Sequence, residues 1–362
     1  MVQGDGAWDL LVARDDLART ELTEGLLPDA GPGQVVLRVD RVGMTANNVT
    51  YALTGDQLSY WQFFPAADGW GRVPLWGFAN VVHSNVKEIE AGDRFYGYYP
   101  TSSHLVVKPG RISERGFRDV SEHRTTLPNV YNGYVATSGD PTYDVAHEDL
   151  HILYRPLFIT SLMLDDFLAD NGFFGATTIL MSSASSKTAY ATAFCLQRRE
   201  QRPKVVGLTS AGNVGFTADL GCYDEVVAYD DVPGIAADGP AVYADFAGNQ
   251  GLRLQLHEQF GDQLVYDAMI GAAHGEELNA GPKVAGPEPT LFFAPSQIAK
   301  RQEDWGPGGV AKAYAEVWDA FVPQVQRWVD VTHDEGPKGL ESAWLEVLAG
   351  KTDPKRGYVI NL

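Results

Sequence analysis

A serine-rich turn near the middle of the chain carries the residue types of an anion-binding loop. It follows Thr177–Met181, a β-branched and apolar run typical of a buried strand, and precedes Ala189–Gln197, an alanine-rich run typical of a helix. Backbone N–H groups at a helix start bind phosphate, and small side chains let a nucleotide approach closely. The glycines of the usual dinucleotide fingerprint are absent, so a serine that caps an ordinary helix is an equally good interpretation. The residues of this turn that we expect to contact a nucleotide are Ser182, Ser183, Ser185, Ser186, Lys187 and Thr188.

Two features favour a phosphorylated nucleotide. Lys187 places a positive charge where a phosphate would lie, although a solvated surface lysine would look the same in the sequence. The next predicted strand, Lys204–Leu208, is followed by hydroxyl and amide side chains and by no acid that could accept a ribose 2′-hydroxyl. An uncharged turn that caps the following helix is the alternative. The sequence predicts NADP(H) as the cofactor, with donors from Thr209, Ser210, Asn213 and Tyr229.

Composition restricts the compartment and the partners. The chain has 362 residues, 44% of them hydrophobic, which suits two globular domains. A formal charge of −19 argues against nucleic acid or an anionic membrane as a partner. We expect the only two cysteines, Cys195 and Cys222, to be buried thiols, with a disulfide as the alternative. The N-terminus has no signal-peptide pattern and no apolar run reaches the ~20 residues of a membrane span, so a cytoplasmic protein is expected.

The pattern of the chain changes near residue 150. Short β-type runs separated by glycine and proline come first, and alternating strands and helices follow, which is typical of a parallel sheet. Two helices and a strand are predicted at the C-terminal end. The early runs are Val35–Val42, Phe78–His83, Arg94–Tyr99 and Ser103–Lys108, and the C-terminal elements are Lys312–Val331, Gly339–Leu348 and Tyr358–Leu362.

Six segments occur in the order found in one superfamily: Gln34–Thr45, Gly92–Tyr98, His104–Pro109, Leu220–Tyr229, Asp245–Asn249 and Ile270–Gly275. The chain thus resembles the medium-chain dehydrogenases/reductases, near their zinc-independent quinone and enoyl reductases. The resemblance implies an α/β fold, with a GroES-like β-rich catalytic domain over residues 1–150, completed by about 325–362. It implies a doubly wound Rossmann cofactor-binding domain over residues 151–325. It also places Thr160, Ala247, Gly271 and Ala272 near the nicotinamide.

The chain departs from the superfamily in ways that indicate a divergent subgroup. Leu75–Val82 stands where zinc-dependent members carry a Gly-His-Glu motif and has no metal ligand, so we expect no metal. An aromatic insert over residues 60–71 is also unusual. Its Tyr60, Trp61, Phe63 and Phe64 are predicted to form a substrate pocket wall with His274, and a core or subunit contact is the alternative.

Thr45–Gly55 corresponds to the substrate-facing loop and helix of the resembling enzymes. Asn48 and Tyr51 are three residues apart and would share a helix face. We expect Tyr51 to donate a proton or to stabilise an oxyanion, and Asn48 to position the substrate. An ordinary packed tyrosine is the alternative for Tyr51.

The function expected from these features is NADPH-dependent, zinc-independent reduction of an activated C=C or carbonyl group in a fairly apolar carbonyl compound. A small-molecule substrate is the expected partner, and a homodimer is implied by the resemblance alone. The alternative is a non-redox enzyme, a lyase or hydrolase on a carbonyl substrate, or a ligand-binding protein, because the missing glycines could crowd a pyrophosphate.

Overall fold

The computed structural model describes residues 6–270, 286–350 and 353–362. The chain divides into two compact units, here called unit 1 (Met1–Leu153 with Val329–Leu362) and unit 2 (Tyr154–Trp328). Within the described residues, no helix combines the length and the apolar character needed to cross a membrane.

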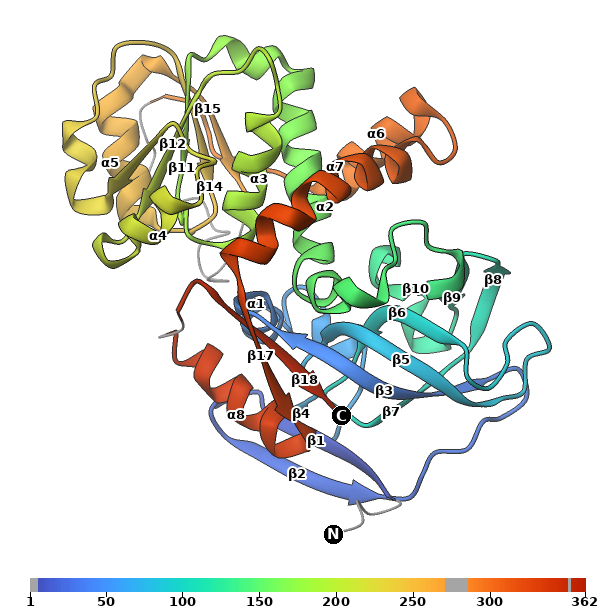
Figure 1. The fold of residues 1–362 in the computed structure, drawn as a ribbon. Helices are drawn as coiled ribbons and strands as arrows, with labels where there is room; N and C mark the ends of the chain where they lie inside the picture. Colours follow the sequence, from blue (N-terminus) through green and yellow to red (C-terminus); the bar gives the residue numbers. More distant parts are fainter. Residues whose placement is uncertain (1–5, 271–285, 351–352) are drawn as a thin grey trace. The chain divides into compact units, whose positions relative to one another are not determined.

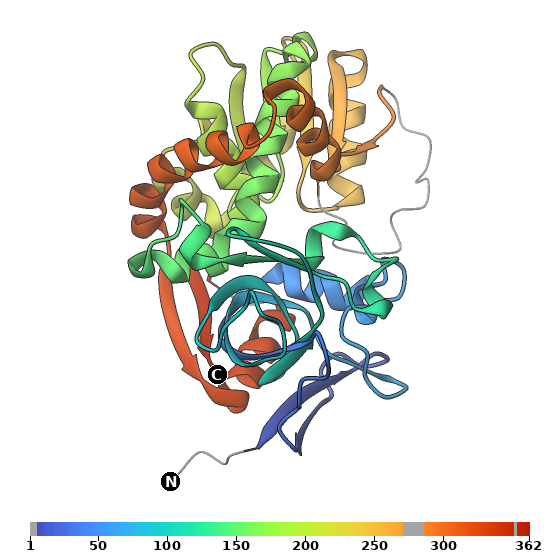
Figure 2. The same cartoon turned by 90° about the vertical axis from the view of Figure 1, so that its right-hand side faces the viewer.

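Unit 1 is built on a bent, mainly antiparallel sheet in the order β17-β18-β3-β5-β6-β10-β9-β8, with β7 also paired to β3. In Figure 2 its blue to teal strands curl round on themselves. A second sheet has the order β2-β1-β4. The strands are β1 (Ala7–Ala13), β2 (Thr20–Gly25), β3 (Val35–Met44), β4 (Trp70–Gly71), β5 (Leu75–Ser84), β6 (Arg94–Tyr99), β7 (His104–Val107), β8 (Pro109–Ser113), β9 (Gly116–Asp119), β10 (Gly133–Ala136), β17 (Asp330–Glu335) and β18 (Arg356–Asn361).

Alternating side chains give unit 1 its core. Strand β3 begins with a fully buried run, Val35, Val36 and Leu37, and then alternates, with Arg38 exposed and Val39 buried. The helices of this unit are α1 (Ala46–Leu53) and α8 (Gly336–Leu348). Buried residues of α8 recur every three or four positions, so one face of the helix packs on the core: Leu340, Ala343, Trp344 and Val347.

Unit 2 contains a parallel sheet in the order β13-β12-β11-β14-β15-β16. Numbered along the chain this is 3-2-1-4-5-6, the order of doubly wound dinucleotide-binding sheets, with the switch point between β11 and β14. The strands are β11 (Thr178–Met181), β12 (Lys204–Thr209), β13 (Glu225–Ala228), β14 (Ala241–Asp245), β15 (Leu264–Met269) and β16 (Thr290–Leu291).

Helices cover this sheet, with α3 and α5 on opposite sides of it (Figure 1). Helix α5 packs through Leu252, Leu256 and Phe260. Phe321 of α7 contacts the rings of α2 and α3, with centroids 4.6 Å from Phe158 and 5.1 Å from Phe194. The helices are α2 (Glu148–Asp170), α3 (Lys187–Gln197), α4 (Val214–Asp219), α5 (Gln250–Phe260), α6 (Ala294–Trp305) and α7 (Gly309–Trp328).

The C-terminal helix prediction needs one correction. Helix α7 ends at Trp328 and not at Val331, because Asp330–Glu335 pairs in parallel with β18 as strand β17. The other predicted strands and helices named above are present within three residues at each end. Helix α6 and strands β1 and β2 were not predicted.

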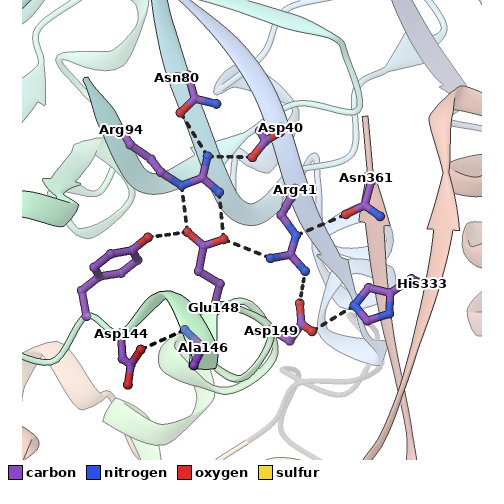
Figure 3. A network of polar contacts seen from close by, with 11 residues as sticks. Asp40, Arg41, Asn80, Arg94, Asp144, Ala146, Glu148, Asp149, His333 and Asn361 are labelled. Atoms are coloured by element: carbon purple, nitrogen blue, oxygen red, sulfur yellow. Dashed lines mark hydrogen bonds and ion pairs between the residues drawn. The ribbon is translucent and has the colours of Figure 1, made fainter. Parts of the chain in front are cut away.

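A network of charges holds the start of α2 in unit 1 (Figure 3). Glu148, in the first turn of α2, accepts from Arg94 at 2.8 and 2.9 Å, from Arg41 at 3.0 Å and from Tyr143 at 2.7 Å. Its neighbour Asp149 pairs with Arg41 and lies 2.9 Å from His333 Nε2 on β17. Strands β3, β6 and β17 are therefore all tied to one helix turn. Arg94 also contacts Asp40 and Asn80, and Arg41 contacts Asn361.

Burial disfavours ionisation of Glu148, but the hydrogen bonds from Arg94, Tyr143 and Arg41 outweigh it and lower the pKa of this carboxyl group. Burial and the hydrogen bond to Glu148 raise the pKa of Tyr143 to about 12. A carboxyl group whose pKa is lowered by folding stabilises the fold above its unfolded pKa, and this stabilisation is lost as the pH falls through the folded pKa.

Replacing Glu148 with Gln should lower the free energy of unfolding by about 3 kcal/mol at pH 7, because two partly buried guanidinium groups lose their shared carboxylate. Urea unfolding of the full chain measures the effect. The difference from the wild type should shrink as the pH falls below about 4. Glu225→Gln, in the exposed Lys204–Glu225 pair, is the matched control and should change the free energy by less than about 1 kcal/mol. Equal effects of the two variants would contradict the prediction.

Candidate functional site

Ser182 is the first residue after β11, and its side chain bonds to the end of β14. Its Oγ donates to Asp245 Oδ1 at 2.7 Å and accepts the backbone N–H groups of Phe246 and Ala247 at 2.9 and 3.0 Å. Ser182 and Asp245 are both fully buried. The Ser182 hydroxyl is therefore used within the sheet, and Ala247, a predicted cofactor residue, lies beside it.

Two further serines of the turn also bond to the protein. Ser185 Oγ accepts from Thr209 Oγ1 at 3.3 Å and from Asn213 Nδ2 at 3.1 Å, which ties the turn to the end of β12. Ser186 is the N-cap of α3, and its Oγ accepts the N–H of Ala189 at 3.4 Å. Ser186 therefore has the helix-capping role that was the alternative to nucleotide contact. The structure also brings three predicted cofactor residues, Ser185, Thr209 and Asn213, together.

The remaining donors of the turn surround the start of α3. Ser183 has a left-handed backbone with φ of +49°, and its N–H donates to Tyr229 Oη at 2.9 Å. Its hydroxyl has no hydrogen-bond partner within the described parts of the chain. Lys187 and Thr188, both half-buried, begin α3, where N–H groups have no acceptor within the helix. The Ser183 hydroxyl and the α3 N-terminus are the groups that can bind an anion here.

Other predicted cofactor residues lie outside the serine turn. Thr160 Oγ1 donates to the Pro156 carbonyl of its own helix α2 at 3.4 Å. Ser161 ties α2 to α3 by donating to the Thr188 carbonyl at 2.8 Å. Ser210 is exposed just beyond β12. Gly271, Ala272 and His274 lie outside the described residues.

In unit 1, Tyr51 lies in an aromatic cluster. Its ring centroid is 4.6 Å from that of Tyr60, 5.5 Å from Tyr98 and 6.2 Å from Tyr131. The Tyr60 and Tyr131 hydroxyl groups are 3.0 Å apart. Three of the four predicted wall residues belong to this cluster, which contains Tyr51, Tyr60, Phe63, Phe64, Trp76, Tyr98, Leu105, Leu127 and Tyr131.

The Tyr51 hydroxyl oxygen receives two donors. Asn47 Nδ2 donates to it at 2.7 Å and Trp76 Nε1 at 3.1 Å. Burial, and after it the neighbouring Tyr60, raise the pKa of Tyr51 well above its usual value, although these two hydrogen bonds act in the opposite direction. The hydroxyl groups of Tyr98 and Tyr131 also interact with that of Tyr51 within the cluster.

Asn48, which is predicted to position the substrate, bonds through both ends of its amide to the protein backbone. Asn48 Oδ1 accepts the N–H of Thr45 at 2.7 Å and its Nδ2 donates to the Pro74 carbonyl at 2.8 Å, so the buried amide forms part of a capping box. It is Asn47, four residues before Tyr51, whose amide donates to the Tyr51 hydroxyl oxygen. Four residues around Tyr51 were not predicted from the sequence: Asn47, Trp76, Tyr98 and Tyr131. Only the i, i+4 spacing of Asn47 and Tyr51 could have pointed to one of them.

Trp61, another predicted wall residue, is almost fully buried. It packs in the main core of unit 1 between two glycines. A Cβ atom at Gly55 would lie 2.2 Å from Trp61 Nε1, and one at Gly71 would lie 2.4 Å from Trp61 Cε3. The indole thus fills space that a side chain at Gly55 or Gly71 would occupy. Trp61 therefore has the core role that was the alternative to a pocket wall.

Cysteine and metal chemistry are not evident in the described structure. Cys195 and Cys222 are free and buried, as expected, and burial raises the pKa of Cys222 to about 12. No three His, Cys, Asp or Glu side chains gather as metal ligands in the described ranges.

Asn48→Ala should lower the free energy of unfolding by about 1–3 kcal/mol, because the Pro74 carbonyl and the Thr45 N–H lose a buried partner. Asn47→Ala should lower it by no more than about 0.5 kcal/mol, since Tyr51 keeps the Trp76 hydrogen bond. Urea unfolding of both variants measures the difference. Equal losses would mean that Asn48 does not cap α1.

Several solved structures share the fold of this chain. CurA from Vibrio vulnificus in complex with NADPH has a TM-score of 0.66 at 12% identity, with 98% of each chain covered. The yhdH oxidoreductase from Salmonella enterica in complex with NADP has a TM-score of 0.57 at 11% identity, covering 98% of this chain and 99% of that one. The quinone oxidoreductase from Coxiella burnetii has a TM-score of 0.55 at 10% identity, with 99% of each chain covered. The predicted combination of a GroES-like and a doubly wound Rossmann fold is confirmed.

Sequence comparison identifies a family. No curated protein matches the chain. A family model does match residues 42–353, a span that includes α1 with Tyr51, the serine turn and α7. The chain therefore belongs to the family described as "Protein of unknown function (DUF2855)".

Proposed function

We propose that the protein is an NADPH-dependent, zinc-independent reductase of an activated C=C or carbonyl group in a fairly apolar carbonyl compound. Unit 2 would hold the nucleotide and unit 1 the substrate. The observation that carries the proposal is the 3-2-1-4-5-6 sheet with the serine turn and the α3 N-terminus at its switch point. Two structures of similar fold hold NADPH or NADP, which supports the same choice for this chain.

The serine side chains fit a bound dinucleotide, although the fingerprint glycines are absent. Ser182 Oγ donates to Asp245 and Ser185 Oγ accepts from Thr209 and Asn213, so both hydroxyl groups have partners within the protein. The main argument for a crowded, non-redox site therefore loses force. We assign the pyrophosphate to the Ser183 hydroxyl, Lys187 and the first N–H groups of α3. The 2′-phosphate is assigned to Ser210, Asn213 and their neighbours after β12, where no acid would repel it.

Tyr51 suits the role of a proton or hydrogen-bond donor. Bound NADPH would supply a hydride to the substrate, and the substrate oxygen or the adjacent carbon then needs a donor. The raised pKa keeps the Tyr51 hydroxyl protonated, and the bonds from Asn47 and Trp76 hold its oxygen in place. The partly buried members of the cluster, Tyr60, Trp76 and Tyr131, would provide apolar contact surface, which favours a substrate of little charge.

The cofactor assignment predicts a difference between nucleotides in a thermal-shift experiment on the full chain. NADPH at about one hundred times its Kd should stabilise the protein by roughly 2.7 kcal/mol, and NADH at the same concentration by much less. Lys187→Ala should weaken NADPH binding by about tenfold or more, because a charged hydrogen bond is lost. Lys204→Ala, which removes an exposed lysine paired with Glu225, is the control and should bind as the wild type does. Absence of any nucleotide effect would overturn the proposed function.

Tyr51→Phe should lower kcat for NADPH-dependent reduction of an apolar enone or quinone by roughly 10² to 10⁴, with little change in the Kd of NADPH. Steady-state kinetics and a nucleotide titration separate the two effects. Tyr358→Phe, in β18 and outside the aromatic cluster, is the matched control with unchanged kcat. An unchanged kcat in Tyr51→Phe would reduce Tyr51 to a packing residue.

A further inference from the structure

One pair of side chains joins the two halves of the parallel sheet where they meet. Strands β11, β12 and β13 form one half and β14, β15 and β16 the other, and a dinucleotide binds across the point where their order reverses. Ser182 follows β11 and Asp245 ends β14. Their 2.7 Å hydrogen bond, here called the Ser182–Asp245 link, is completely buried at this switch point.

The link also shapes the loop after β14. Asp245 Oδ1 accepts the N–H groups of Ala247 and Gly248, both at 3.0 Å, while Ser182 Oγ accepts those of Phe246 and Ala247. Gly248 has a φ of +64°, a conformation that favours glycine. Four backbone contacts, two to Ser182 and two to Asp245, therefore fix residues 246–248 beside the serine turn.

A buried ionic chain holds Asp245 in turn. Arg253 Nη2 of α5 lies 2.5 Å from Asp245 Oδ2, and its Nε lies 3.1 Å from Asp267 Oδ2 on β15. His257 Nε2 lies 2.8 Å from the same Asp267 oxygen. All four side chains are buried. A charged group so placed is restrained on every side, so Asp245 presents its oxygens to the loop and to Ser182 in one orientation.

We propose that Ser182 and Asp245 are positioning residues that make the two halves of the dinucleotide site bind as one. The proposal rests on the proposed function. The link sets residues 246–248, on the nicotinamide half, relative to the serine turn that binds the pyrophosphate. It also gives a reason for serine in place of the fingerprint glycine, because glycine has no side chain with which to form the link.

Calorimetric titration of the full chain with two probes tests the proposal. NADPH spans both halves, whereas adenosine 2′,5′-bisphosphate reaches only the half that binds the adenosine. Ser182→Ala should weaken NADPH binding by about tenfold and change the affinity for the bisphosphate by less than about twofold. Ser182→Gly should behave in the same way. Thr192→Ala, which removes an equally buried hydroxyl of α3 away from the strand ends, is the control and should leave both affinities unchanged.

The outcomes separate the two proposals. Wild-type protein that binds neither probe would show that the proposed function is wrong. Wild-type protein that binds NADPH, with variants that lose both probes equally or neither, would overturn only the positioning role. Tighter NADPH binding by Ser182→Gly would also overturn it, because the serine side chain would then obstruct the site instead of organising it.

Discussion

Buried backbone N–H groups at the carboxyl ends of parallel strands need acceptors, and in unit 2 side-chain oxygens supply them. Ser182 and Asp245 accept the N–H groups that follow β14. The carboxylate group of Asp245 is itself fully buried. An ionised carboxylate in such a place needs a cation, which is Arg253, and the guanidinium in turn faces a second carboxylate, Asp267. The need for acceptors in one loop thus accounts for polar side chains at the ends of β11 and β14 and on α5 and β15.

Unit 1 also contains a network of paired charges, which lies at the start of α2. Glu148 and Asp149 are acids in a first helical turn, where the helix dipole favours negative charge. Arg41 and Arg94 neutralise them from β3 and β6, and His333 adds a contact from β17. Since the chain enters unit 2 within α2 and returns just before β17, this network holds both connecting segments to the sheet of unit 1.

Sequence patterns predicted the elements well, because strand and helix periodicity is local. The roles of particular side chains depended on distant contacts. Asn47, for which no role was predicted, donates to Tyr51, whereas the amide of Asn48 donates to the distant Pro74 carbonyl. Two neighbours in the aromatic insert pack in different clusters. Gly55 and Gly71 leave room for Trp61 in the main core, whereas Phe63 packs with the tyrosines. Nothing in the residue type of a serine distinguishes one that bonds to β14 from one that could bind phosphate.

In the proposed reaction Tyr51 would act as a proton donor. Hydrolysis by a side-chain nucleophile needs a base to activate it, and the imidazole that contacts the cluster, His123, has its Nε2 3.3 Å from the Phe63 carbonyl oxygen. Tyr51 cannot act as that base at neutral pH, because burial raises its pKa and keeps its proton on the oxygen. With two donors already directed at this oxygen, the chemistry open to Tyr51 is to give its hydrogen to an acceptor. An oxygen or carbon that becomes negative during reduction is such an acceptor, so the environment of Tyr51 and the sheet order of unit 2 support the same reaction.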